Sequence, residues 1–499
     1  MTAPLETLTR QIDKAVPAAQ APFIRAVAET LFDKASPEFI ADLGPESLLA
    51  ITLGALRLVE EHRPGQVQVR LYNPRFQSEG WDFPGTAVEV LLEDRPFLVD
   101  SVRNELRRQG LRIDYQLHPV LRVGRRQDGE LDLVPEAGTT LSYQLCLVER
   151  VEEPQRLEGI RQALARVLED VVLATDDYRP MLARAGQARD YLRGLARGAD
   201  PERAEELAEQ AEFLDWLGQN NFVFLGYREY DVRECQGQLC VQSDAASGLG
   251  ILRGRPSSMQ EPVPLASLPE TLRQRVIEGP ALMVTKANSP ATVHRSARLD
   301  YVGVKKYDAQ GKVCGERRFL GLFTSQALST PVKDIPILRR KLTRVLALDG
   351  AAPGSHDYKQ IVTIFNSLPR EELFWAEPEP LHREIRTLMA MEQESEVRLT
   401  VRRDPTGRGL LVMVIMPRDH FNATVRQKIQ DLLTRRLEAR HVDYQLSMGE
   451  EEEQVRFHFY LTTDVRLESL DLEALEHDVA QLARTWEEHL EERLVRLHG

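Results

Sequence analysis

Residues 86–110 read TAVEVLLEDRPFLVDSVRNELRRQG and predict a strand, a short loop and a helix in succession. The first eight residues are mainly β-branched or aliphatic, which favours a strand, and an alternating strand at 67–72 precedes them. The helix presents one apolar face, formed by Leu98, Val99, Val102 and Leu106. Strand signals at 111–123 and 142–151 and a helix at 154–172 follow. The order β-α-β-β-α matches most of a ferredoxin-like split βαβ unit.

A second stretch near the end of the chain repeats this order. Residues 409–417, GLLVMVIMP, predict a buried strand, and a helix follows the loop that ends at Asn422. Strands at 441–448 and 454–461 complete a β-α-β-β unit. We therefore expect a multidomain α+β protein with two ferredoxin-like βαββαβ units.

The other segments are helical or strand-rich. Helical periodicity marks 1–64, 176–219 and 335–394, whereas 220–334 contains strands such as NNFVFLGYREYDV. The segment 469–499 begins a long amphipathic helix, which would pack either on the second βαβ unit or on further protein. The predicted divisions are 1–64, 65–175, 176–219, 220–334, 335–394, 395–468 and 469–499.

Composition narrows the class of protein. The chain has 499 residues, which is enough for about three domains. Its formal net charge of −13 argues against a nucleic-acid partner. Its four cysteines form no C-x-x-C pair, which suits a reducing compartment. Without a signal peptide or an apolar run of about 18 residues, we expect a cytoplasmic protein with no membrane partner.

Local catalytic motifs are missing from the sequence. It contains no P-loop, G-x-S-x-G elbow or H-E-x-x-H pair. The glycines from Gly248 to Gly254 have the wrong spacing for a dinucleotide fingerprint and follow a polar stretch, which favours a loop. His356 and Asp357 could be an acid–base or metal pair, but Ser355 before them predicts a helix N-cap. We therefore predict no catalytic, cofactor-binding or metal-binding residue in this chain.

Several long stretches resemble a known family. They are EFLDWLGQNNFVFLGYREYDV from Glu212, SARLDYVGVKKYD from Ser296, GSHDYKQIVTIFNSLPREELF from Gly354 and MPRDHFNATVRQKIQ from Met416. Together they resemble the N-terminal region of the large bacterial NAD-dependent glutamate dehydrogenases. The resemblance implies ACT-type domains at 65–175 and 395–468, a PAS-like antiparallel-sheet domain at 220–334 and helical connectors. It also places the NAD-binding catalytic domain further along the chain.

The resemblance also implies effector sites. In ACT domains, an amino-acid effector binds near the loop after the first strand, where helix N–H groups can hold a carboxylate. The corresponding loops predict effector-binding residues Asp94, Arg95, Asp100, Arg418, Asp419 and Asn422. Phe97 stands where the family pattern has glycine, and its ring would obstruct a ligand. Alternatively, Asp94 caps the helix and Phe97 packs, and Arg418 is a surface arginine.

The predicted function is regulation and assembly within a large NAD-dependent glutamate dehydrogenase. The complete enzyme would use NAD as its cofactor to convert glutamate to 2-oxoglutarate and ammonium. The implied partners are the chain's own downstream catalytic domain, further copies in a homo-oligomer and an amino-acid effector. The alternative is a stand-alone amino-acid-sensing ACT-type protein. A third hypothesis is an enzyme with its pocket around Phe222 and Tyr227.

Overall fold

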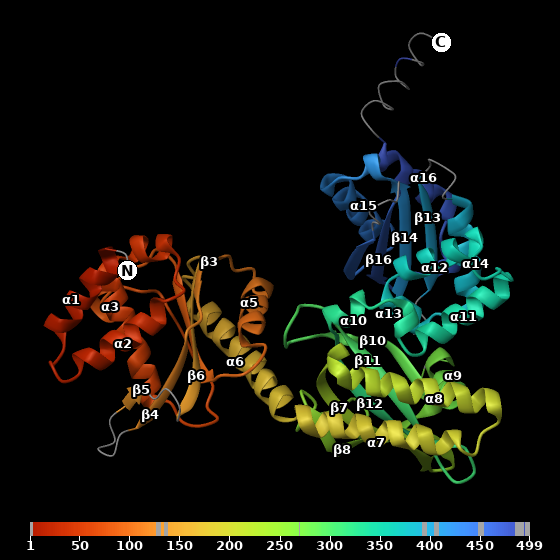
Figure 1. The fold of residues 1–499 in the computed structure, drawn as a ribbon, viewed down its shortest axis with the longest axis horizontal. Helices are drawn as coiled ribbons and strands as arrows, with labels where there is room; N and C mark the ends of the chain where they lie inside the picture. The colour runs from red at the N-terminus through yellow and green to blue at the C-terminus, as the bar shows by residue number, and fades with distance from the viewer. Residues whose placement is uncertain are drawn as a thin grey trace.

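The computed structural model describes residues 3–125, 131–133, 138–268, 270–391, 397–403, 409–447, 454–484 and 494. It is a multidomain α+β structure, in which helices alternate with three antiparallel sheets. Figure 1 shows the first sheet and its helices on one side and the other two sheets stacked on the other, with one long helix running between the two sides.

The N-terminal helices cover one face of the first sheet. They are α1 (Ala3–Ala15), α2 (Ala21–Phe32) and α3 (Pro37–Glu61). Ser36 caps α3 as its S-P-E sequence predicts, and Gly44 at φ +70° breaks the helix before Pro45. By length and composition α3 is the one described helix that could span a membrane. Its buried side chains, however, share a core with α1, α2 and the first sheet, as expected for an interior helix.

The first sheet has the spatial order β1-β2-β6-β4-β5, with β3 also paired to β6. Its elements are β1 (Gln68–Tyr72), α4 (Phe76–Glu79), β2 (Thr86–Glu93), α5 (Leu98–Arg108), β3 (Ile113–Leu117), β4 (Val120–Arg125), β5 (Leu131–Leu133), β6 (Thr139–Val148) and α6 (Pro154–Asp176). If the short α4 and β5 are set aside, and β3 and β4, which both pair with β6, are counted as one interrupted strand, the chain order is β-β-α-β-β-α. The outer strand β1 precedes the predicted β-α-β-β stretch. Helices α5 and α6 cover the face opposite to α1–α3.

The middle sheet has the order β10-β11-β12-β7-β8-β9. This region contains α7 (Tyr178–Ala196), α8 (Pro201–Trp216), η1 (Leu217–Asn221), β7 (Phe222–Cys235), β8 (Gln238–Gly250), β9 (Val263–Pro264), η2 (Leu265–Ser267), α9 (Glu270–Glu278), β10 (Leu282–Pro290), β11 (Arg298–Tyr307) and β12 (Val313–Phe323). The polar sequence between Asp244 and Pro264 favours a loop, but β8 continues as far as Gly250, and only the residues after it form turns and loop before β9. One face of this sheet shares a core with α5 and α6.

The other face of the middle sheet packs with α7, α8 and a helical segment in one continuous core. That segment contains α10 (Ser325–Ser329), η3 (Val332–Asp334), α11 (Leu338–Asp349), α12 (His356–Ser367), α13 (Arg370–Trp375) and α14 (Pro378–Met391). Met413 and Ile415 of the last sheet join this core. The middle sheet, the helical segment and the last sheet therefore contribute side chains to one apolar core.

The last sheet has the order β13-β14-β16-β15. Its region contains β13 (Arg398–Arg403), β14 (Gly409–Pro417), η4 (Arg418–His420), α15 (Ala423–Arg436), β15 (His441–Ser447), β16 (Gln454–Thr462), η5 (Leu467–Ser469) and α16 (Leu472–Ala483). The chain order β-β-α-β-β-α repeats that of the first sheet. Helix α16 packs on this sheet together with α15. Most of the long terminal helix expected after Ala483 lies outside the described residues.

Candidate functional site

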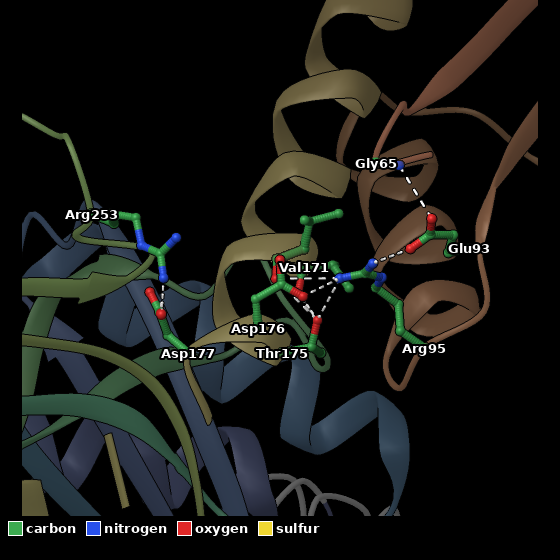
Figure 2. A network of polar contacts seen from close by, with 9 residues as sticks. Gly65, Glu93, Arg95, Val171, Thr175, Asp176, Asp177 and Arg253 are labelled. Atoms are coloured by element: carbon green, nitrogen blue, oxygen red, sulfur yellow. Dashed lines mark hydrogen bonds and ion pairs between the residues drawn. The ribbon is translucent and has the colours of Figure 1, made fainter. Parts of the chain in front are cut away.

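The loop between β2 and α5 is engaged with the end of α6. The Arg95 guanidinium donates to Val172 O (3.4 Å), Thr175 Oγ1 (3.1 Å) and Asp176 Oδ1 (2.9 Å). It also lies 3.4 Å from Glu93 Oε2 (Figure 2). The last turn of a helix leaves carbonyls without intrahelical donors and favours a nearby cation. Arg95 therefore serves as a cap for α6 in this structure.

The rest of this loop docks on the segment around His294 of the middle region. Phe97 has φ +75°, and its ring centroid lies 4.9 Å from that of His294. Asn104 Nδ2 donates to His294 O (2.6 Å), and Asp100 Oδ2 lies 3.6 Å from His294 Nδ1. Burial lowers the pKa of His294, and Asp100 opposes that shift. The predicted packing role of Phe97 is confirmed.

Asp94 does not cap α5, so that alternative is wrong. The helix begins at Leu98 with Phe97 in the N-cap position, and no side chain makes a cap hydrogen bond there. The backbone N–H of Asp94 donates instead to Thr140 O (2.8 Å), which extends the pairing between the strands. The loop therefore turns one residue before the helix, through the left-handed conformation of Phe97.

Two aspartates of α6 and its end join this helix to the middle sheet. Asp177 Oδ2 accepts from Gly250 N (2.7 Å), and its other oxygen pairs with Arg253 (Figure 2). Asp170 accepts from Thr292 Oγ1 (2.7 Å) and pairs with Arg255. Burial raises the pKa of Asp170, and Thr292 opposes this.

Gly250 is required at this junction by its surroundings. It has φ +59°, and a Cβ there would lie 2.1 Å from Leu225 O. Among the glycines from Gly248 to Gly254, Gly250 is the last residue of β8, and its backbone lies in close contact with Leu225 and Asp177. No helix begins directly after them, as a dinucleotide site would require.

The equivalent loop of the last sheet is arranged differently. Asn422 caps α15 by accepting from Val425 N (2.9 Å). Arg418 and Asp419 form part of a short 3-10 turn, and both are exposed. Phe421 packs against Phe457, with ring centroids 5.2 Å apart. The structure thus places the predicted residues at two separate loops. Arg95 and Phe97 of the first are engaged by contacts with α6 and His294, whereas Arg418 and Asp419 of the second are exposed.

A buried charge cluster, which we call the Arg402 cluster, links α13 and α14 to the last sheet. Arg402 lies 2.7 Å from Glu372 Oε2 and 2.9 Å from Glu384 Oε2. Burial raises the pKa of Glu372 to about 7 against the opposing effect of Arg402. Burial likewise raises the pKa of Glu384. His458 Nδ1 lies 3.7 Å from Glu372 Oε1, and burial lowers the pKa of His458 to about 3.

A second buried group links the middle sheet to α13. Lys286 Nζ lies 2.6 Å from Asp300 Oδ1 and 2.8 Å from Glu371 Oε1. Burial opposes the charge on Lys286, but the two carboxylates together raise its pKa. Burial raises the pKa of Asp300, and Lys286 opposes this. A buried charge is tolerated only with such partners, so this group holds the two regions in one arrangement.

Sequence reasoning missed the Arg402 cluster. Its members lie up to 86 positions apart, and no local spacing joins them. One signal was present: the buried strand QVRFHFYLT carries Arg456 and His458 between apolar residues. Charged or titratable groups at such positions indicate a polar contact on the face opposite to the helices.

Other candidate residues have structural roles. Ser355 caps α12 by accepting from Tyr358 N (3.1 Å), which confirms the cap prediction, and His356 is exposed. Phe222 and Tyr227 are buried in the apolar core. Within the described ranges, no three His, Cys, Asp or Glu side chains are grouped as metal ligands.

Three family models match the chain. The glutamate dehydrogenase ACT1 domain matches residues 27–164, helical motif 1 matches 335–394 and the ACT2 domain matches 398–487. We refer to the first and last sheets with their α5–α6 and α15–α16 pairs as the ACT1 and ACT2 units.

Curated relatives agree with these matches. The NAD-specific glutamate dehydrogenase of Halomonas elongata is 35% identical over 482 residues, covering 92% of this chain and 29% of that protein. The corresponding enzyme of Pseudomonas aeruginosa is 33% identical over 486 residues, covering 95% and 29%. That of Mycobacterium tuberculosis is 28% identical over 421 residues, covering 81% and 24%. The chain thus spans under a third of the length of these relatives. It belongs to the family of large NAD-specific glutamate dehydrogenases and corresponds to their N-terminal region.

Proposed function

We propose that this chain is the regulatory and assembly region of a large NAD-dependent glutamate dehydrogenase. The complete enzyme converts glutamate and NAD to 2-oxoglutarate, ammonium and NADH in a catalytic domain further along the chain. One observation carries the proposal: buried charges join each unit to the next, at Asp170, at Lys286 and at Arg402. Such charges penalise any other arrangement of the units, because separation leaves a partner unpaired.

The proposed architecture is two ferredoxin-like ACT units flanking a PAS-like sheet. The strand orders support this. In both ACT units the two central strands are the second and fourth main strands of the unit, as in a split βαβ fold, with the outer strand supplied from upstream. The five long strands of the middle sheet have the order second, first, fifth, fourth, third, which supports the PAS-like assignment.

An activity assay tests the proposal. Purified 499-residue protein, mixed with glutamate and NAD, is expected to produce no NADH, while a complete family enzyme assayed alongside does. Glutamate-dependent NADH production by this chain would contradict the proposal. We further propose that the region acts in the cytoplasm and pairs with further copies of itself, without nucleic acid or membrane. Light scattering after size exclusion measures the assembly.

The second candidate is a stand-alone amino-acid-sensing protein. One observation favours it: Arg418 and Asp419 are exposed beside the N-terminus of α15. An arginine in that position can meet a carboxylate with two hydrogen bonds. Calorimetric titration with amino acids tests it, and loss of binding in Arg418→Gln would support it.

A further inference from the structure

A cavity of about 260 Å³ lies where three regions meet. Its walls come from the middle sheet, from the turn and helix at Pro369–Trp375, and from the ACT2 sheet. This cavity is on the face of the ACT2 sheet opposite to α15 and α16, and it is therefore distinct from the loop at Arg418. A ligand bound in it would touch all three regions at once.

The ACT2 wall is a row of side chains across the sheet. Leu411 pairs with Tyr460, and Tyr460 pairs with Asp443, so the three side chains point to the same face. His458 lies two residues along β16 on this face, and its Nε2 is buried without a hydrogen-bond partner in the described part of the chain. The wall thus offers an aromatic surface, a carboxylate and a neutral imidazole.

The middle-sheet wall supplies two guanidinium groups. Arg295 donates to Phe323 O (3.1 Å), and Arg298 lies 5.1 Å from the ring centroid of Tyr460. Neither arginine makes an ion pair with any residue that the structure describes, and both are half-buried. Their charges are available to an anion, and a guanidinium suits a carboxylate.

The helical wall supplies carboxylates. Glu371 shares the ammonium group of Lys286 with Asp300, and Glu372 shares the guanidinium of Arg402 with Glu384. In each case two carboxylates face one cation, so this wall is rich in acceptor oxygens. The indole of Trp375 lies beside them in the same wall.

We infer that this cavity binds an amino-acid zwitterion, with its carboxylate at Arg295 and Arg298 and its ammonium group toward Glu371 and Asp443. A dianionic phosphate ester would meet the same carboxylates and be repelled, and an apolar ligand would leave the arginines desolvated. The volume is below the roughly 300–1,000 Å³ of pockets for larger ligands. The inference rests on the proposed regulatory role and locates the effector site in this cavity.

A ligand in this cavity would affect how the three regions are arranged. Because its walls belong to three regions, the ligand binds only when they are together, and it stabilises that arrangement. Its ammonium group would also lie near Glu372, within the Arg402 cluster. Binding is therefore coupled to the contact between helical motif 1 and the ACT2 unit.

Calorimetric titration of the 499-residue protein with each of the twenty L-amino acids tests the inference. At least one is expected to bind saturably. Its deaminated acid and its decarboxylated amine, each lacking one charge, should bind at least tenfold more weakly. Arg295→Gln and Arg298→Gln should each weaken binding at least tenfold, while Arg418→Gln leaves it unchanged.

Fluorescence provides a second readout that needs no charge substitution. Ligand binding should change the emission of Trp375, and Trp375→Phe should remove that change. No binding by any of the twenty amino acids overturns the inference, as does binding that survives both arginine variants or is lost in Arg418→Gln. The titration reports binding alone, so it can fail while the NADH assay still supports the proposed function.

Discussion

The ACT1 and ACT2 units share the order of their main strands, although the ACT1 sheet has six strands and the ACT2 sheet four. They differ in what covers the sheet face away from their own helices. In ACT1 this face is covered by α1–α3 in a largely apolar core. Its buried Glu89 accepts from Tyr143 Oη within the sheet (2.7 Å). In ACT2 the same face carries Arg402, Arg456 and His458, and it meets α13, α14 and the cavity.

The sheet face covered by the unit's own helices is therefore similar in the two units, while the opposite face differs according to what packs on it. The apolar alternation that packs α5–α6 or α15–α16 is common to both units. The side chains on the opposite face are mainly apolar where a helical layer covers it, as in ACT1, and include buried charges where it meets α13 and α14, as in ACT2. The loops differ in the same way, since Arg95 is engaged and Arg418 is exposed.

The largest expected effect is at the Arg402 cluster. Arg402→Gln leaves Glu372 and Glu384 buried without their cation, and this should lower the free energy of opening of the ACT2 sheet by about 3–5 kcal/mol. Hydrogen exchange of the β14 and β16 amides measures the loss. Arg436→Gln, which removes an exposed pair with Asp478, is the matched control and should cost about 0–1 kcal/mol. Equal effects of the two variants would refute a special role for the cluster.

The second prediction concerns pH. Glu372 has a pKa of about 7 against an ordinary 4.5, so its protonated form stabilises the fold fully below pH 4.5. That stabilisation is lost as the pH rises through 7, by about 3 kcal/mol at 1.36 kcal/mol per unit. Glu372→Gln should abolish the loss.

The measurement is the difference in unfolding free energy between the native protein and Glu372→Gln from pH 4.5 to 8. The lowered pKa of His458 gives the opposite slope, with stability lost as the pH falls below 6.5, but it is present in both proteins. A difference that stays constant with pH would show that Glu372 does not titrate in this range.

The third prediction compares the two loops. Arg95→Gln removes a charged donor from the end of α6 and should destabilise that helix end by about 1.5–3 kcal/mol. Arg418→Gln, at the equivalent loop, should change stability by less than about 0.5 kcal/mol. Hydrogen exchange in the last turn of α6 and the first turn of α15 measures both. A larger effect at Arg418 would mean that its loop is engaged in solution.

The smallest effect is expected at Phe97. Glycine there relieves a left-handed conformation that costs other residues about 1–2 kcal/mol, but it loses a ring contact worth about 0.5–1.5 kcal/mol. Phe97→Gly should therefore change the unfolding free energy by less than about 1 kcal/mol. Phe97→Ala keeps the strain and loses the ring, so it should be less stable than the glycine variant by about 1 kcal/mol. If the two variants are equally stable, the backbone at Phe97 is unstrained.

The helices and strands were largely predictable because their patterns are local. The Ser36 and Ser355 caps and the two βαββ stretches all follow from residues within a few turns of one another. The alternating pattern at 67–72 predicts the strand β1, but that pattern does not predict its pairing with β2. Pairing depends on which edge is open, and no periodicity contains that information.

By itself, the sequence determined the elements, the two repeated units and the family, because each rests on residues close together in the chain. Only the tertiary structure decided that Arg95 caps α6, that Phe97 meets His294 and that Glu372, Arg402 and His458 share one buried cluster. The physical reason is that burial, which sets the strength of a charge contact, arises only when distant segments exclude water together.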